Sequence, residues 1–189
     1  MIQFLNRRWL LIVSALLAVF VLAACGGPPP VTSWPGYSVP GDIAYLAAAS
    51  ELAAIDISGT FVGSLRGWPL KSPDATMGYY SQPALSPDGK TMYVGTEQMN
   101  GNEGKLMAFV NVDRAAEQNP TLEWTYPLTD TDPIPGNIYG AIVLDNDQIF
   151  FADGKGQVFA LDAQTGQPRS EPTNEPEMSM AASSLAAAR

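Results

Sequence analysis

Few side chains in this sequence could carry chemistry, and their types exclude several mechanisms. The 189 residues include no histidine and a single cysteine, Cys25. Without histidine the chain cannot form a Ser-His-Asp or Cys-His relay, a His-ligated zinc site or an imidazole base. One cysteine allows neither an intramolecular disulfide nor a thiolate cluster. The remaining candidates are carboxylate pairs and the thiol of Cys25 itself.

Two carboxylate pairs have a spacing that could supply oxygen ligands to calcium. They are Asp130 with Asp132 and Asp145 with Asp147. Neither pair continues into a loop with the glycine and distal glutamate of an EF-hand, and both lie beside turn-forming residues. We therefore interpret them as turn caps. No spacing selects a carboxylate pair for glycoside hydrolysis, so we predict no catalytic, cofactor-binding or metal-binding residue.

Net charge limits the partners of the chain. It carries 19 Asp and Glu against 10 Lys and Arg, a formal charge of −9. Nucleic-acid binding requires a basic surface, so we predict no nucleic-acid partner.

The N-terminal segment has the layout of a secretory signal peptide. Arg7 and Arg8 precede an apolar run over residues 9–24, which ends in small residues. As a helix this run would extend about 24 Å, which is short of a hydrocarbon core about 30 Å thick. A permanent membrane-spanning anchor is therefore the weaker interpretation.

The end of this run, Leu22, Ala23, Ala24 and Cys25, resembles the lipobox of bacterial lipoproteins. The resemblance implies diacylglyceryl transfer to the Cys25 sulfur, cleavage after Ala24 and acylation of the new amino terminus, for example by palmitate. Several acyl chains would hold the protein on a membrane stably, because one chain binds only marginally. We expect a signal peptide over 1–24 and a lipidated cysteine with a Pro/Gly-rich tether over 25–40. The protein would then lie on the extracytoplasmic face of a bacterial cell membrane or outer membrane.

Beyond residue 40 the sequence predicts an all-β domain. Short apolar runs alternate with hairpin turn signals such as Ser86-Pro-Asp-Gly89 and Asp145-Asn-Asp147, and no long helical periodicity interrupts them. We predict strands in three groups: 43–46, 52–57 and 60–65; 82–85, 91–95, 105–110 and 122–126; 140–144, 148–152 and 157–161.

The three groups repeat at a spacing near fifty residues, which is typical of propeller blades. Corresponding segments are Ala44-Tyr45-Leu46, Met92-Tyr93-Val94 and Ile149-Phe150-Phe151, and also Ala54-Ile55-Asp56, Ala108-Phe109-Val110 and Ala160-Leu161-Asp162. The runs 106–110 and 157–161 are apolar at successive positions. That pattern favours strands packed by neighbouring blades on both faces.

The segment 156–166 resembles the PQQ-like, quinoprotein-type repeat, with its Gly-x-Val-x-Ala-Leu-Asp-x-x-Thr-Gly pattern. Trp124 matches the tryptophan of the last strand in such a blade. The resemblance covers residues 41–172 and implies an antiparallel, four-stranded β-propeller. We expect an incomplete ring of two and a half to three blades, because the first unit lacks a clear opening strand and the third a Trp-bearing last strand. Residues 173–189 do not continue the pattern and are expected to be a disordered tail.

Aromatic residues offer a second set of candidates, which are Trp68, Tyr79, Tyr80, Trp124 and Tyr139. We interpret them as blade core rather than as a stacking box for a ligand. The segment 66–80 could be an exposed recognition loop, but we favour an ordinary connection between blades.

The lipobox and repeat type together are similar to those of the BamB family of outer-membrane-assembly lipoproteins, whose ring is complete. The similarity implies a non-enzymatic scaffold that binds envelope proteins, or associates with itself through open blade faces. The alternative is a fragment of a PQQ-dependent oxidoreductase. Such enzymes are expected to have a vicinal cysteine pair, calcium and a full ring, so we predict no cofactor here. A non-functional remnant is a third possibility.

Overall fold

The computed structural model describes residues 36–59 and 62–173, which belong to one compact unit. The predicted signal peptide, the predicted lipobox with Cys25 and residues 174–189 of the predicted tail lie outside the described residues. All regular structure in the described part is β-strand, as the sequence predicted. The strands are β1 (Gly36–Ser38), β2 (Ile43–Ala48), β3 (Glu51–Asp56), β4 (Gly63–Ser64), β5 (Leu70–Lys71), β6 (Met77–Tyr79), β7 (Ala84–Leu85), β8 (Thr91–Gln98), β9 (Leu106–Val110), β10 (Thr121–Tyr126), β11 (Val143–Asp145), β12 (Gln148–Ala152) and β13 (Val158–Asp162).

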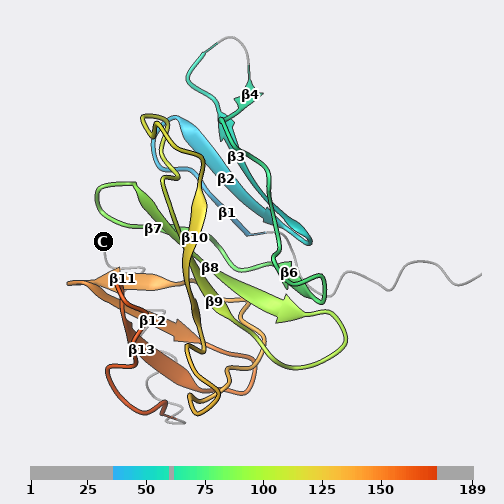
Figure 1. The fold of residues 1–189 in the computed structure, drawn as a ribbon, viewed down its shortest axis with the longest axis vertical. Helices are drawn as coiled ribbons and strands as arrows, with labels where there is room; N and C mark the ends of the chain where they lie inside the picture. The colour runs from blue at the N-terminus through green and yellow to red at the C-terminus, as the bar shows by residue number, and fades with distance from the viewer. Residues whose placement is uncertain (1–35, 60–61, 174–189) are drawn as a thin grey trace, which may run out of the picture. The chain divides into compact units, whose positions relative to one another are not determined.

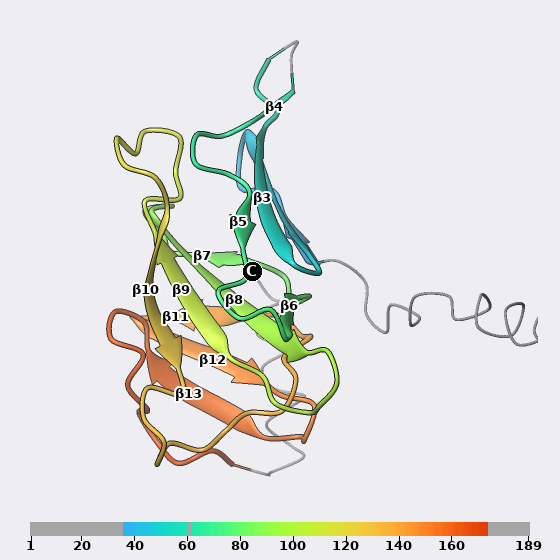
Figure 2. The same cartoon turned by 45° about the vertical axis from the view of Figure 1, so that its right-hand side comes forward.

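These strands form three antiparallel sheets that follow one another along the chain (Figures 1 and 2). The first, blade 1, has the order β1-β2-β3-β4, and β5 also pairs with β3. Blade 2 has the order β10-β9-β8-β6, with β7 also on β8, and blade 3 has the order β11-β12-β13. Three up-and-down sheets in sequence order are the architecture of a partial β-propeller, which confirms the predicted fold class.

Hairpin turns follow the predicted turn chemistry. Asn146 and Asp147, with φ of 46° and 62°, link β11 to β12 as a two-residue turn. Positive φ at both central residues is the geometry that Asn and Asp tolerate best after glycine. Between β7 and β8, Gly89 has a φ of 72° and donates its N–H to the Ser86 carbonyl.

Blades 1, 2 and 3 contact one another in turn near their opening strands. Residues Gln82 and Ala141 form a parallel bridge between blades 2 and 3. On the blade 1 side, a Cβ added at Gly36 would overlap the backbone of Ser81 and Gln82. Blade 1 therefore approaches blade 2 closely at a position that only glycine fits.

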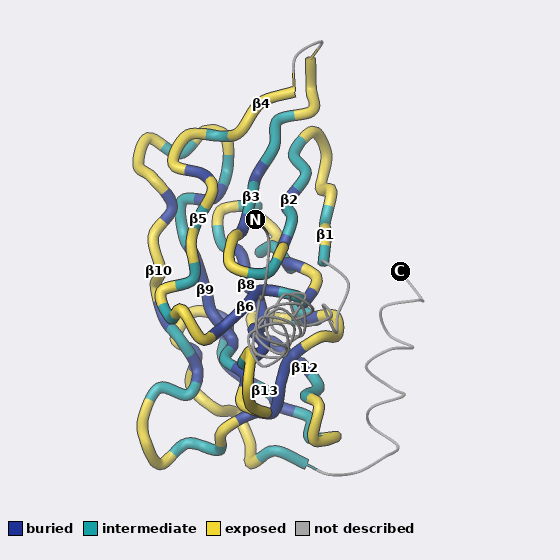
Figure 3. The backbone as a smooth tube through the Cα atoms, turned by 90° about the vertical axis from the view of Figure 1, so that its right-hand side faces the viewer, coloured by how far each residue is buried: buried dark blue, intermediate teal, exposed yellow. Residues whose placement is uncertain are grey.

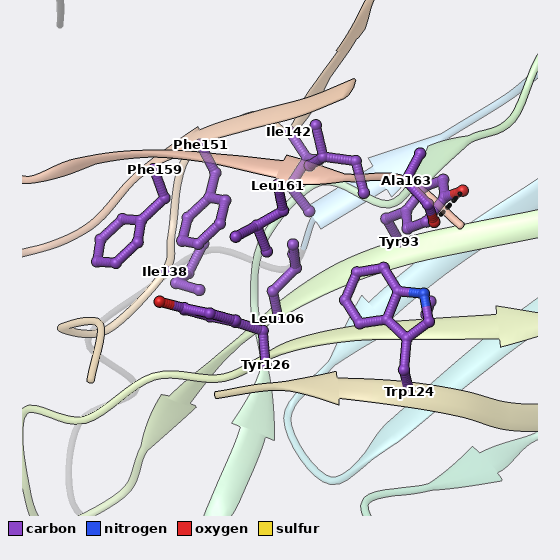
Figure 4. Close-up of a cluster of buried hydrophobic side chains, with 12 residues drawn as sticks. Tyr93, Leu106, Trp124, Tyr126, Ile138, Ile142, Phe151, Phe159, Leu161 and Ala163 are labelled. Carbon is purple, nitrogen blue, oxygen red and sulfur yellow. Dashed lines mark hydrogen bonds between the residues drawn. The ribbon is translucent and has the colours of Figure 1, made fainter. Parts of the chain in front are cut away.

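Blade 2 is buried on both faces, because alternate side chains along its strands enter two different cores. Blades 1 and 2 share one core, which contains Met92, Val94, Met107 and Phe109 of blade 2 and Tyr45, Ala47, Leu52 and Ala54 of blade 1. Tyr93, Leu106, Ala108, Trp124 and Tyr126 pack with Ile149, Phe151, Phe159 and Leu161 of blade 3 (Figure 4). The burial of the central strands β8 and β9 is visible in Figure 3.

The structure corrects several predictions at the ends of the blades. Blade 1 does have an opening strand, because β1 pairs with β2 inside the segment predicted as tether. Segment 66–80 connects blades 1 and 2, as favoured above, but it also contributes the short strands β5 and β6 and buries Trp68, Met77 and Tyr79. Strand β13 is buried on one face only. As predicted, blade 3 has no full last strand in the described residues, although 167–173 hydrogen-bond along β13, and Thr173 pairs with Val158.

Candidate protein-binding faces

Each of the two interfaces between blades contains an equivalent hydrogen bond, from a tyrosine hydroxyl to a backbone carbonyl. In blade 1, the Tyr45 hydroxyl donates to the Val112 carbonyl of blade 2 at 3.1 Å. In blade 2, the Tyr93 hydroxyl donates to the Ala163 carbonyl of blade 3, also at 3.1 Å (Figure 4). Tyr45 and Tyr93 are 1% and 3% exposed. Desolvation by burial raises the pKa of both hydroxyls to about 12, so they remain protonated donors at neutral pH.

A tryptophan accompanies each of these tyrosines. The ring centroids of Tyr45 and Trp68 lie 5.8 Å apart, and those of Tyr93 and Trp124 lie 5.9 Å apart. Trp124 also covers Gly166, where an added Cβ would lie 2.8 Å from the indole. The glycine at the end of the Asp-x-x-Thr-Gly pattern thus allows the tryptophan of one blade to pack on the next.

The aspartate of the same pattern organises the turn before that glycine. One oxygen of Asp162 accepts the N–H groups of Gln164 and Thr165 and the Thr165 hydroxyl. These bonds from Thr165, together with Arg169 and Gln164, hold the pKa of the Asp162 carboxyl below its usual value. The motif is therefore explained by turn structure and blade contact, with no ligand required.

Blade 3 has a second face that packs against neither core of the described residues. We call it the blade-3 open face, and its apolar residues are Val143, Phe150, Ala152, Val158 and Ala160. All five are half-buried. Cross-strand register places a polar row of Asp145, Gln148 and Asp162 at one end of this face.

Blade 1 has a corresponding face on the opposite side of the arc. We call it the blade-1 open face, and its residues are Tyr37, Ala44, Leu46, Ala53, Ile55 and Ile57. Ala44, Leu46, Ala53 and Ile55 are half-buried, and Tyr37 and Ile57 are 67% and 41% exposed. An apolar face on each terminal blade is the kind of surface that proteins use for contact with other proteins.

Ion pairs neutralise the equivalent aspartates Asp56 and Asp162. Asp56 of blade 1 pairs with Arg114 of blade 2 at 2.6 Å, and hydrogen bonds from Ser58 are the main cause that lowers the pKa of its carboxyl. Asp162 pairs instead with Arg169 from its own blade. Each of these carboxylates therefore has an arginine partner within the described chain.

One member of the acidic pairs is confirmed as a turn cap: Asp132 accepts the N–H groups of Leu128 and Thr129 at 2.9 and 2.8 Å. Asp145 precedes the two-residue hairpin turn described above, and Asp147 lies in that turn. A cleft of about 670 Å³ is lined in part by Asp88, Asp145 and Asp147. Across residues 36–59 and 62–173, no group of three or more acidic or cysteine side chains could hold a metal ion.

The predicted aromatic core is correct in most positions. Trp68, Tyr79 and Trp124 are buried and Tyr80 is half-buried, whereas Tyr139 is 43% exposed and is not core. The lipobox residues and Cys25 lie outside the described residues and stay a prediction. No helix in the described part of the chain is long and apolar enough to cross a membrane.

Sequence reasoning missed the interfacial role of Tyr45 and Tyr93. The signal was present, because the two tyrosines occupy equivalent positions in consecutive repeats, with Phe150 in the third. Which face each one occupies follows only from the sheet register and the order of the blades.

Three antiparallel meanders that share two cores define this chain as a partial β-propeller. Its fold is similar to a solved structure, the crystal structure of BamB from Moraxella catarrhalis, with a TM-score of 0.45 and 17% sequence identity. The match covers 71% of this chain and 38% of that one, so the matched region spans well under half of the longer protein. No protein-family model matches this chain, and no curated protein matches it.

Proposed function

We propose that this chain is a lipid-anchored β-propeller module that binds proteins at the bacterial envelope and catalyses no reaction. One observation carries the proposal: each terminal blade presents an apolar face that no core of the described residues covers. Equivalent faces inside the arc are buried against a neighbouring blade. Covering the open faces in the same way would gain free energy from burial of apolar surface.

Membrane attachment in this proposal rests on the sequence. Residues 1–24 would direct export, Cys25 would carry the lipid, and residues 26–35 would link the lipid to the first strand of blade 1. With 19 acidic against 10 basic residues, the chain gains little from electrostatic attraction to anionic headgroups, so the acyl chains supply the membrane affinity. A role in envelope protein assembly is supported by the resemblance of lipobox and repeats to the BamB family.

The anchor is tested by Cys25→Ser in the full chain, expressed in a bacterium and labelled with radioactive palmitate. We expect the variant to lose the label and to accumulate as the uncleaved precursor. Cys25→Ala serves as a second variant that also lacks the sulfur nucleophile. Normal cleavage together with undiminished labelling of either variant would refute lipidation at this position.

Protein binding is tested by site-specific photo-crosslinking in intact cells. A photoreactive phenylalanine analogue replaces Phe150 on the blade-3 open face or Leu46 on the blade-1 open face. The control position is Gln118, which is exposed and lies on neither face. We expect protein adducts from positions 150 and 46 and none from 118. Adducts from no position, or equally from all three, would contradict binding through the open faces.

A further inference from the structure

We infer that Asn100 is a site of spontaneous deamidation, and that the isoaspartate formed there releases Asn137 from the loop between β8 and β9. Asparagine is among the thermolabile residue types. Its side chain can react with the backbone nitrogen of the next residue, and Asn100 is followed by glycine, which hinders that nitrogen least. The other described asparagines precede larger residues; they are Asn102, Asn111, Asn119, Asn137 and Asn146.

The first argument is the exposure of the reacting residues. Asn100 and Gly101 lie in the loop that joins β8 to β9, which extends beyond the blade 2 sheet (Figure 1), and both are exposed. The side-chain amide of Asn100 makes no hydrogen bond within residues 36–59 and 62–173. By contrast, Asn137 is 5% exposed, and both ends of its amide are hydrogen-bonded. Water therefore reaches Asn100, and its amide can turn toward the next backbone nitrogen.

The second argument is that the attacking nitrogen is weakly held. Gly101 N–H donates to the Gln98 carbonyl at 3.4 Å, beyond the usual range of about 2.7–3.2 Å for this type of bond. Freeing this nitrogen therefore costs less than opening a bond of the sheet ladder. Asn119 is the opposite case, because it precedes Pro120, whose nitrogen carries no hydrogen.

The reaction needs water and no other co-reactant. The Gly101 nitrogen attacks the side-chain carbonyl carbon of Asn100 and loses its proton, and the side-chain nitrogen leaves as ammonia, which closes a succinimide ring. Water then opens the ring at one of its two carbonyls. Opening at the main-chain carbonyl gives isoaspartate, and opening at the side-chain carbonyl gives aspartate. Both products carry a carboxylate in place of the amide, and the released ammonia takes up the proton.

The loop that contains Asn100 also holds the segment that connects blade 2 to blade 3. Asn137, in that segment, donates its Nδ2 hydrogen to the Gly101 carbonyl at 3.3 Å and its backbone N–H to Asn102 Oδ1 at 3.4 Å. Its Oδ1 accepts the Gln98 N–H at 3.0 Å. Isoaspartate inserts one additional main-chain atom directly before Gly101. The Gly101 carbonyl must then move, and Asn137 loses that contact.

The modification is tested by storing the purified full chain in detergent micelles at mildly alkaline pH and mapping its peptides by mass spectrometry. We expect the peptide with Asn100 to gain about one dalton, because an NH₂ group is exchanged for OH. Isoaspartate and aspartate at this position are distinguished by their fragments. Asn111, Asn137 and Asn146 serve as internal references in the same sample and should remain unchanged.

Gly101→Ala is the matched variant that keeps the asparagine. Its methyl group crowds the attacking nitrogen, so the gain in mass at Asn100 should slow several-fold. An added Cβ would overlap the end of the Gln98 side chain, which is flexible and can move aside without a change in the backbone. Circular dichroism checks that this variant retains its β-sheet content.

The release of Asn137 is tested by amide hydrogen exchange of the stored protein. The Gln98 amide, which depends on Asn137 Oδ1, should exchange about two- to tenfold faster in the isoaspartate form. Freshly purified Asn100→Asp adds the same charge with an ordinary main chain, so its Gln98 amide should exchange as in the wild type. The Ala163 amide, bonded to the Asp147 carbonyl in blade 3, is the reference in all samples.

A chain that gains no mass at Asn100 during storage overturns the inference, and so does an equal gain at Asn111 or Asn146. A gain that Gly101→Ala does not slow overturns attack by the Gly101 nitrogen. Isoaspartate that leaves Gln98 exchange unchanged, or an equal acceleration in Asn100→Asp, overturns the release of Asn137 through the lengthened main chain.

Discussion

Removing the Tyr93 hydroxyl should show how much one hydrogen bond between blades 2 and 3 adds to stability, apart from the packing of the aromatic ring. Tyr93→Phe deletes one oxygen that donates to the Ala163 carbonyl at 3.1 Å, across the contact between blades 2 and 3. A net hydrogen bond between neutral groups contributes about 0.5–1.5 kcal/mol, and an unpaired buried carbonyl adds to the loss. We expect the free energy of unfolding to fall by about 1–2 kcal/mol.

Tyr126 provides a matched control in the same core. It is fully buried, and its hydroxyl has no hydrogen-bond partner in the described part of the chain. Tyr126→Phe therefore removes an oxygen whose desolvation nothing compensates. We expect no loss, or a gain of up to about 1 kcal/mol. Tyr45→Phe should behave like Tyr93→Phe, since its hydroxyl makes the equivalent bond to Val112.

The assay is urea unfolding followed by tryptophan fluorescence, with equal slopes for the variants as a condition for comparing free energies. A protein concentration at which the wild type and the variants share one oligomeric state keeps association out of the difference. Equal effects of Tyr93→Phe and Tyr126→Phe would refute the assignment of the Tyr93 hydroxyl as the bond that joins the two blades.

Two further predictions concern glycine and pH. Gly166→Ala and Gly156→Ala both place alanine at positive φ, 71° and 80°, at a cost of about 1–2 kcal/mol, but only the first also meets Trp124. Thermal unfolding should therefore show the larger loss for Gly166→Ala, and equal losses would contradict the packing of Trp124 on the turn. Burial raises the pKa of Tyr45, Tyr79, Tyr93 and Tyr126 from 10 to about 12. Because the unfolded chain releases these protons first, stability should be complete below about pH 10 and fall between about pH 10 and 12. Urea midpoints that stay constant across that pH interval would refute the predicted loss of stability.

The repeated strands could be predicted because local signals specify them. Turn chemistry such as Ser86-Pro-Asp-Gly89 and short apolar runs locate the long strands of all three blades. Strand β1 was missed, because Gly36-Tyr37-Ser38 lies among prolines and shows no alternation. Strands β5 and β6 have two and three residues, too few for any period to be visible, and their pairing depends on neighbours distant in sequence.

The candidate site was harder to predict than the fold, because burial is decided by the neighbouring blade. Tyr139 is aromatic and follows the buried Ile138, yet it lies in a loop and is 43% exposed. Strand β13 reads as apolar on both faces, but only Phe159 and Leu161 meet a partner blade. Residue type alone does not show which blades are terminal in the arc.

Equivalent side chains in the three repeats differ in burial, and this comparison shows that the open faces lack a covering blade. Ala54 and Ala108 are buried against a following blade, while their equivalent Ala160 is half-buried on the blade-3 open face. The strands themselves are alike, so the difference lies in what packs on them. A sheet face with the composition of an inner interface is fully packed only when another blade covers it. The exchange of tyrosine for phenylalanine at position 150 removes the one buried donor that such a contact would have to satisfy, and leaves the apolar part of the interface in place.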